Sequence, residues 1–144
     1  MTRLHATSQS FYREEVLRSD LSEILRLEEL LSELAYKAGF SEERAPLFVV
    51  AVTEALSNAI LHGNREQPEK SVFLRVRWEP EHKLLSVEVQ DEGEGFDYTN
   101  LPDPTQEDNL LRESGRGIFL MKSLANEVLF REGGRCVELR FFLP

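Results

Sequence analysis

The chain has 144 residues, which suits one compact domain with a single hydrophobic core. Hydrophobic residues make up 41% and charged residues 30%, and this balance excludes a disordered chain. The formal net charge of −9 argues against a nucleic-acid-binding protein, because such proteins neutralise phosphates with Lys and Arg. The single cysteine, Cys136, fits a reducing compartment, and we expect neither a signal peptide nor a membrane-spanning helix. We therefore predict a cytoplasmic protein that contacts no membrane.

The chain begins with the patterns of a strand and a first helix. Residues 1–9 are expected to form a tail, and residues 10–17 are typical of a strand. Apolar residues at helical spacing predict a helix that starts after Asp20, with Glu23 placed for a capping box. Gly39 is expected to end this helix.

A second helix, predicted over about residues 46–62, is apolar nearly all round, which is typical of a buried helix. Its polar exceptions are Thr53, Glu54, Ser57 and Asn58, which at about 100° per residue share one sector. A buried carboxylate is costly unless it is paired, hydrated or bound to metal, so this sector should border a wet cavity. The amide oxygen of Asn58 suits Mg²⁺, and the carboxylate of Glu54 suits a base. The alternative is that both face solvent on a surface helix.

After the second helix the apolar pattern changes to a period of two, which predicts strands. The expected elements are strands at 72–78 and 85–89, a helix at about 118–125, and strands at about 127–131 and 135–142. Helices in the first half and most strands in the second indicate an α+β fold, with helices on one face of a sheet. We assign residues 10–144 to one domain.

An acidic, glycine-rich loop at residues 91–95 follows the predicted hairpin directly. Gly93 and Gly95 permit positive φ and let the backbone approach a ligand closely. Asp91, at the end of the strand, can accept a hydrogen bond from an exocyclic amine such as that of adenine. The alternative is an ordinary acidic turn, since a lone Asp-x-Gly-x-Gly motif is weak evidence of a site.

A second glycine-rich motif stands where the helix before the last two strands is expected to open. Gly115 and Gly117 at a helix N-terminus would leave backbone N–H groups free for a phosphate, with Arg112 and Arg116 as nearby cations. The alternative is a plain helix entry with a flexible linker. The polar stretch before the motif is long for a loop in a compact domain, so residues 97–117 are expected to form a lid.

In this order and context, the three motifs resemble the boxes of a known family. Residues 54–64 resemble the N box of the GHKL ATPase superfamily, residues 91–96 its G1 box and residues 115–117 its G2 box. The short form, with Asn-Ala-Ile-Leu-His-Gly-Asn at 58–64, is most similar to the anti-sigma factor serine-protein kinases. The resemblance covers nearly the whole chain from about residue 10. It implies the Bergerat fold, a two-layer α/β sandwich with a mixed, mostly antiparallel sheet.

The resemblance also implies roles for individual residues. Carried over by position, it assigns Mg²⁺ to Asn58, the catalytic base to Glu54, adenine to Asp91, the shape of the nucleotide pocket to Gly93 and Gly95, and the phosphate-side lid to Gly115 and Gly117. One departure is Arg135-Cys136-Val137, which stands where many relatives carry a Thr near the adenine.

The family implied by this resemblance uses ATP and Mg²⁺ to phosphorylate a serine on a small anti-anti-sigma antagonist of the STAS type. When the antagonist is phosphorylated, the kinase sequesters a sigma factor, and a homodimer is expected. We therefore predict an ATP-dependent serine-protein kinase that regulates transcription by partner switching. Two alternatives stay open: a catalytically inactive, nucleotide-dependent binding module, and a detached histidine-kinase catalytic domain.

Overall fold

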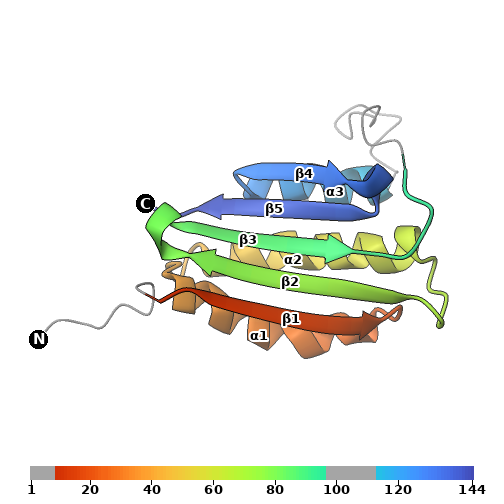
Figure 1. The fold of residues 1–144 in the computed structure, drawn as a ribbon, viewed down its shortest axis with the longest axis horizontal. Helices are drawn as coiled ribbons and strands as arrows, with labels where there is room; N and C mark the ends of the chain where they lie inside the picture. Colours follow the sequence, from red (N-terminus) through yellow and green to blue (C-terminus); the bar gives the residue numbers. More distant parts are fainter. Residues whose placement is uncertain (1–8, 97–112) are drawn as a thin grey trace, which may run out of the picture.

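The computed structural model describes residues 9–96 and 113–144, without the side chains of 113–116 (Figure 1). Residues 1–8 of the expected tail and residues 97–112 of the expected lid lie outside this part of the chain. The strands are β1 (Phe11–Arg18), β2 (Ser71–Glu79), β3 (Leu84–Gln90), β4 (Glu127–Arg131) and β5 (Cys136–Phe142). The helices are α1 (Ser22–Ala38), α2 (Ala45–Asn58) and α3 (Glu113–Leu124), with a π-helical turn, Ala59–Gly63, continuing α2.

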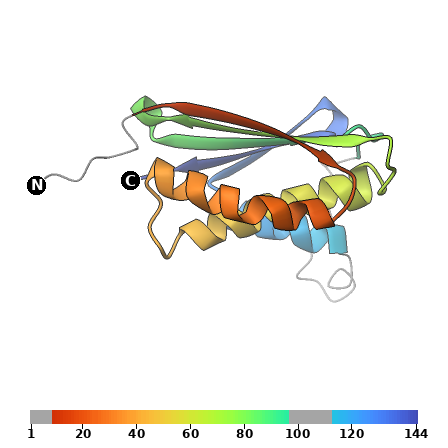
Figure 2. The ribbon, with the colours of Figure 1, turned by 90° about the horizontal axis from the view of Figure 1, so that it is seen from below.

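The described strands form one sheet in the order β1-β2-β3-β5-β4. Each neighbouring pair is antiparallel, so the mixed sheet that we expected is a wholly antiparallel one among these strands. Figures 1 and 2 show the helices together on one face of the sheet. The α+β class and the two-layer arrangement predicted from the sequence are confirmed.

The core lies between the sheet and the helices, because alternation along the strands sends every second side chain there. The clearest example is β2, whose buried residues are Val72, Leu74, Val76 and Trp78. Fully burying an apolar side chain of this kind stabilises a fold by about 1.5–3 kcal/mol. Phe48 and Phe141 meet edge to face with ring centroids 5.0 Å apart, and so join α2 to β5.

The start of α1 differs from the capping box that we predicted. Asp20 Oδ1 accepts a hydrogen bond from Ser22 N (2.9 Å), but the Glu23 carboxylate accepts one from Arg18 N (3.0 Å). This hydrogen bond from the Arg18 amide is the main reason that the pKa of Glu23 is lowered. Glu23 therefore ties the helix to the strand before it. At the other end, Gly39 has a φ of 107° and closes the helix as predicted.

The second helix begins where the sequence predicted, with Pro46 in its first turn, but it does not end as a regular helix. A π-helical turn at Ala59–Gly63 follows α2, and Asn64 N donates to Ala59 O (2.8 Å), five residues back. π-helical turns inside helices are frequent at functional sites. The apolar pattern did not reveal this one.

The segment Ala45–Gly63 is 19 residues long and contains an 18-residue stretch with a mean hydropathy of 1.4, so by length and composition alone it would pass as a membrane span. The core helix of a globular domain passes the same test. This segment is such a helix, because Phe48 and Leu56 are completely buried against the rest of the fold.

The third helix starts at Glu113 and not at about 118. Gly115, Arg116 and Gly117 therefore lie within its first turns, so the expectation that they form a loop ahead of the helix is wrong. Residues 113–117 of the expected lid are helical. Glycine inside a helix costs about 1 kcal/mol relative to Ala, and α3 therefore begins with residues of low helix propensity.

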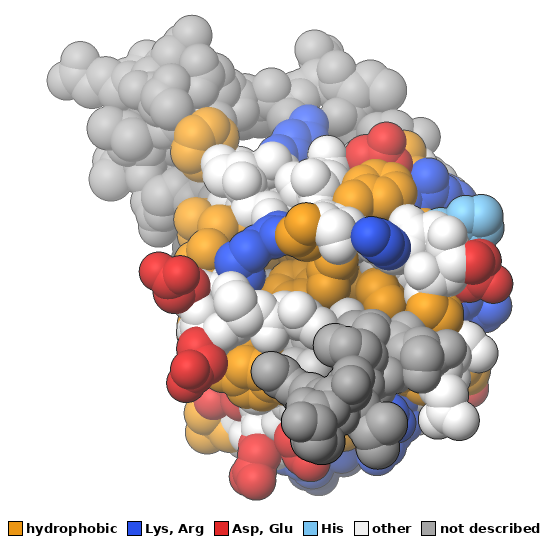
Figure 3. All heavy atoms as spheres, turned by 90° about the vertical axis from the view of Figure 1, so that its left-hand side faces the viewer, with side chains coloured by type: hydrophobic (Ala, Val, Ile, Leu, Met, Phe, Trp, Pro, Cys, Tyr) orange, Lys and Arg blue, Asp and Glu red, His pale blue; other side chains and the backbone are white. Residues whose placement is uncertain are grey.

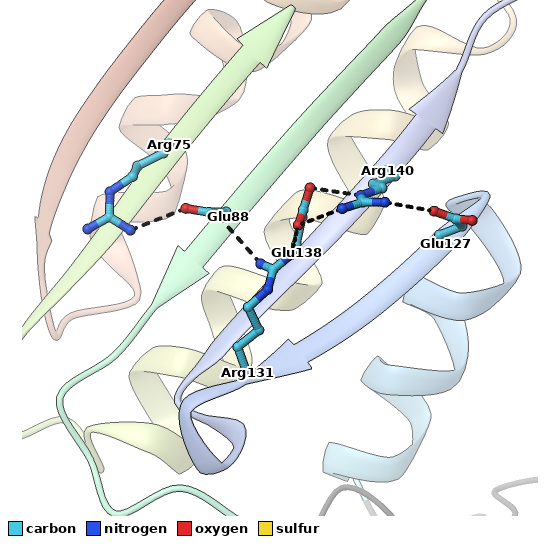
Figure 4. A network of polar contacts seen from close by, with 6 residues as sticks. All are labelled: Arg75, Glu88, Glu127, Arg131, Glu138 and Arg140. Atoms are coloured by element: carbon cyan, nitrogen blue, oxygen red, sulfur yellow. Dashed lines mark hydrogen bonds and ion pairs between the residues drawn. The ribbon is translucent and has the colours of Figure 1, made fainter. Parts of the chain in front are cut away.

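The sheet face turned away from the helices carries a chain of ion pairs (Figure 4). Glu138, 7% exposed, accepts hydrogen bonds from Arg131 and from Arg140 Nε (2.9 Å). Arg131 NH1, on β4, also pairs across β5 with Glu88 Oε2 (3.4 Å) on β3. Burial works to raise the pKa of Glu138, but the hydrogen bonds from Arg140 and Arg131 outweigh it and the pKa is lowered. The network therefore joins the strands through ionised groups.

The end of the sheet that carries the turn Pro80–His82 faces the viewer in Figure 3. Apolar side chains gather in its centre, with Lys and Arg side chains around them. Lys37 Nζ lies 5.0 Å from the ring centroid of Phe11, and Arg44 Cζ lies 5.3 Å from that of Phe40. The motifs singled out in the sequence lie toward the opposite end.

Candidate functional site

A cavity of about 180 Å³ opens between α2, α3 and the neighbouring ends of β3 and β5. Its apolar walls include Ala55, Val89, Ile118, Met121, Phe130 and Val137. Its polar side chains, among the described residues, are Asn58, His62, Asp91 and Arg135. A largely apolar cavity with a few converging polar groups is the usual form of a small-molecule site.

Asp91 is the buried acid of this cavity, 8% exposed and directly after β3. Its backbone N donates to Arg135 O (2.9 Å), and its Oδ1 accepts from Gly93 N (2.8 Å), which fixes the carboxyl group in the wall. Burial raises the pKa of Asp91, against the opposing effects of the Gly93 hydrogen bond and the charges of Arg135 and Lys70. A ligand that donates a hydrogen bond to this carboxylate would favour its ionised form.

Glycines let the backbone pack directly against Asp91. A Cβ atom at Gly63 would overlap the Asp91 carboxylate, and one at Gly93 would overlap the carbonyl oxygen of Gly63. The end of the π-helical turn and the loop after β3 therefore touch with no side chain between them. Gly95 has a φ of 83°, which favours glycine, and a Cβ atom there would overlap Gly133 O.

Glu54 and Asn58 lie one turn apart on α2 and meet α3 at Gly117. A Cβ atom at Gly117 would lie 3.1 Å from Asn58 Nδ2 and 3.2 Å from Glu54 Oε2. Both polar side chains therefore end beside the same point of the α3 backbone, and both are half-buried. Asn58 also lines the cavity that holds Asp91, so the cavity adjoins the place where these two side chains meet.

The side chain of Asn58 fits an Mg²⁺ ion held by few protein groups. Mg²⁺ takes oxygen ligands, keeps several waters and is commonly bound together with substrate phosphates. In the described part of the chain, no three His, Cys, Asp or Glu side chains cluster in a way that could hold a metal ion. A metal at Asn58 would therefore take most of its contacts from water and from a phosphate-bearing ligand. Glu54 offers a neighbouring carboxylate that can accept a proton.

The residues predicted from the sequence divide into three groups in space. The cavity lining contains Asn58, Asp91 and Gly95. The residues that adjoin this lining are Glu54, Gly93 and Gly117. The backbone of Gly115 and Arg116 belongs to α3, whereas the side chain of Arg116 and the whole of Arg112 lie outside the described residues.

The cavity lining also includes residues that were given no role in the site from the sequence, among them His62, Phe96, Phe130 and Arg135. His62 belongs to the π-helical turn, which no pattern predicted. Phe96 and Phe130 meet edge to face with centroids 5.4 Å apart. Arg135 lies two residues before Val137, and residues two apart along a strand point to the same face of a sheet. This spacing could have placed Arg135 on the cavity side from the sequence. Of the stretch Arg135-Cys136-Val137 that departs from the family pattern, Arg135 and Val137 line the cavity.

A model of the family described as histidine kinase-like ATPase domain matches residues 17–141 of the chain. The chain belongs to this family. It is 27% identical over 120 residues to "Serine-protein kinase RsbW" of Staphylococcus aureus strains MRSA252 and MW2, over 78% of this chain and 75% of each relative. These matches confirm the resemblance to the superfamily and to its serine-protein kinases.

A solved structure resembles the fold. It is the structure of the RsbU and RsbW domains of Rv1364c from Mycobacterium tuberculosis, with a TM-score of 0.65 and 16% sequence identity. The match covers 92% of this chain and 32% of that one, so the chain spans about a third of that relative. At this identity the likeness supports the fold.

Proposed function

We propose that this protein is an ATP- and Mg²⁺-dependent serine-protein kinase that acts as an anti-sigma factor. The observation that carries the proposal is the convergence of Asp91, Asn58 and Glu54 where α2, α3 and the end of β3 meet. This convergence occurs in a member of an ATPase family whose matched relatives are named serine-protein kinases. A cavity alone would suit many ligands. The carboxylate of Asp91 suits the base of a nucleotide, and the amide of Asn58 and the carboxylate of Glu54 suit the metal and the proton transfer at its phosphates.

In the proposed complex, the buried carboxylate of Asp91 accepts a hydrogen bond from the exocyclic amine of adenine, and the apolar walls enclose the base. Gly93 and Gly95 leave the backbone of the loop free to approach the nucleotide. The amide oxygen of Asn58 contacts Mg²⁺, which neutralises charge on the phosphates. On the phosphate side we assign the lid contacts to Gly115, Gly117, Arg112 and Arg116.

The proposed reaction is transfer of the γ-phosphoryl group to a serine hydroxyl. Glu54 accepts the hydroxyl proton as the serine oxygen forms its bond to the γ-phosphorus. The bond between that phosphorus and the β,γ-bridging oxygen breaks, and ADP leaves with the bond's electron pair. Glu54 and Asn58 are held on one rigid helix, so the base and the metal contact keep a fixed separation.

The proposed partners follow from the family likeness. The phosphorylated serine belongs to a small anti-anti-sigma antagonist of the STAS type, and the second partner is a sigma factor that this protein sequesters. We further propose a homodimer that works in the cytoplasm. The acidic net charge of −9 is consistent with protein partners and does not favour nucleic acid.

The test of kinase activity uses Glu54→Gln, which keeps the size of the side chain and removes the base. With radiolabelled ATP and a purified anti-anti-sigma antagonist of the STAS type, transfer should fall by about 10²- to 10⁴-fold while ATP binding changes little. Glu28→Gln, at an exposed position of α1, is the matched control and should transfer at the wild-type rate. Absence of transfer by the wild-type protein would favour the inactive binding module.

A further inference from the structure

Asn64 stands out among the buried polar side chains that the structure describes, because it alone has 0% exposure. Its side-chain amide makes three hydrogen bonds. Nδ2 donates to Ser71 O and to Ser19 Oγ, both at 2.9 Å, and Oδ1 accepts from Glu92 N at 2.7 Å. Both donor hydrogens of the amide are therefore in use, as the burial of such a group requires.

Two of these hydrogen bonds belong to a closed ring of three residues. Asn64 Oδ1 accepts from Glu92 N, Glu92 Oε1 accepts from Ser71 N (2.6 Å), and Ser71 O accepts from Asn64 Nδ2. The ring joins the residue after the π-helical turn, the first residue of β2 and the loop after β3. Ser19, at the end of β1, holds the amide from outside the ring and donates to Lys70 O.

We propose that Asn64 is a positioning residue for base recognition, which acts through the peptide between Asp91 and Glu92. The N–H that Asn64 Oδ1 accepts belongs to this peptide, so the hydrogen bond fixes the orientation of Asp91 on its C-terminal side. The preceding Gly63 packs directly on the Asp91 carboxylate. Two consecutive residues therefore hold the Asp91 carboxylate in place, Gly63 by direct packing and Asn64 by a hydrogen bond to the following peptide.

Only an amide of this length supplies both functions of Asn64. In Asn64→Asp, one carboxylate oxygen can still accept from Glu92 N, but the other replaces a donor and faces Ser71 O, an acceptor. The ring opens at that contact and the loop is free to shift. The inference rests on the proposed nucleotide site, although it does not depend on kinase activity.

The experiment compares two ligands that differ only in the group that Asp91 recognises. The Kd of MgATP and of Mg-purine riboside triphosphate, which lacks the exocyclic amine, is measured by calorimetry for each variant. The wild-type protein should prefer ATP, and Asn64→Asp should reduce this preference by about tenfold, the equivalent of one misplaced hydrogen bond. Glu92→Ala, which opens the ring at an exposed residue, should reduce it by a smaller factor, about threefold.

Three control variants keep the ring closed. Glu92→Gln retains Oε1 and should restore the wild-type preference. Ser19→Ala removes the outer partner of Asn64 and leaves the ring bonds in place. Asn126→Asp repeats the same chemical change at a residue whose Oδ1 accepts from Phe142 N (2.8 Å), at the other end of β5. Each should keep the wild-type preference for ATP.

The outcomes separate a positioning role from a general structural one. Equal weakening of both ligands by Asn64→Asp and Glu92→Ala, with the preference unchanged, would overturn the inference. If Asn64→Asp does not fold, the preference for ATP is compared between Glu92→Ala and Glu92→Gln, and an equal preference in the two variants would overturn the inference. A wild-type protein that binds neither nucleotide would refute the proposed function and this inference with it. One that binds both equally would refute this inference alone.

Discussion

Replacing Asp91 by Asn tests recognition of the base with the smallest change of shape. The amide oxygen of the variant can still accept from Gly93 N, which lies 2.8 Å from Oδ1 in the wild-type protein. Its NH₂ group, however, would meet the adenine amine with a donor instead of an acceptor. Loss of a hydrogen bond to a charged group at a buried site costs about 1.5–3 kcal/mol, so the Kd for MgATP should rise about 10- to 150-fold in calorimetry.

The stability of the nucleotide-free protein should move in the opposite direction. Burial raises the pKa of Asp91 above its value in the unfolded chain, so the folded state holds the proton more tightly. The stability linked to this group is therefore fully present at low pH and is lost as the pH rises through the folded pKa. At pH 7, well above the pKa of an aspartate in the unfolded chain, the burial of this group lowers the stability of the empty protein, and Asp91→Asn should raise the midpoint of thermal unfolding.

Asp20→Asn is the matched control for Asp91→Asn. Hydrogen bonds from Ser22 lower the pKa of Asp20, so its linked stability is present at neutral pH and lost on acidification. The control should therefore lower the unfolding midpoint slightly and leave the affinity for MgATP unchanged. Wild-type affinity in Asp91→Asn would refute recognition of the base by this carboxylate. A fall in its unfolding midpoint at pH 7 would refute the account of its burial.

Gly117→Val should lower the rate of phosphoryl transfer about tenfold or more in single-turnover assays. A Cβ atom at this position would lie only 3.1 Å from Asn58 Nδ2 and 3.2 Å from Glu54 Oε2, so the larger side chain would displace both groups at a cost of about 1–3 kcal/mol. A wild-type rate would contradict this reading. Glu138→Gln should lower the free energy of unfolding at pH 7 by about 1–3 kcal/mol, because a neutral amide accepts weaker hydrogen bonds from Arg131 and Arg140. Because the pKa of Glu138 is lowered, the difference from wild type should shrink below about pH 4.5 in urea titrations; a difference independent of pH would contradict the assignment.

The regular elements were predictable where one physical rule dominates. Alternation in β2 and β3 follows from a sheet with one buried face, and the apolar stripe of α1 follows from packing on that sheet. Gly39 ended α1 as expected, because its φ of 107° is open to glycine. These are local consequences of residue type, so the sequence alone was sufficient for them.

Glu23 has the spacing of a capping box, but its carboxylate accepts from the Arg18 amide, five residues earlier, and so ties the helix to β1. The other features that were missed depend on contacts between distant segments. The π-helical turn brings Gly63 against Asp91, a contact across 28 residues of sequence that no periodicity encodes. Gly117 was assigned to the lid ahead of the helix, whereas it lies in α3 where a side chain would crowd Glu54 and Asn58 of α2.

The candidate site was predictable in part. Asn58 and Asp91 were identified from residue chemistry and order, and they line one cavity. Arg135 was noted only as part of a departure from the family pattern, although it lies two residues before Val137 and therefore on the same, cavity-facing side. Asn64 was noted only as the last residue of the motif at 58–64, since the role of a buried amide is recognisable only when its three partners are known.

The most direct test of the central claim is calorimetric titration of the protein with ATP, in the presence and absence of Mg²⁺. The account predicts a single adenine-nucleotide site whose affinity rises with Mg²⁺ in the wild-type protein and loses this dependence in Asn58→Ala. No binding heat with MgATP, or equal dependence on Mg²⁺ in Asn58→Ala, would contradict it.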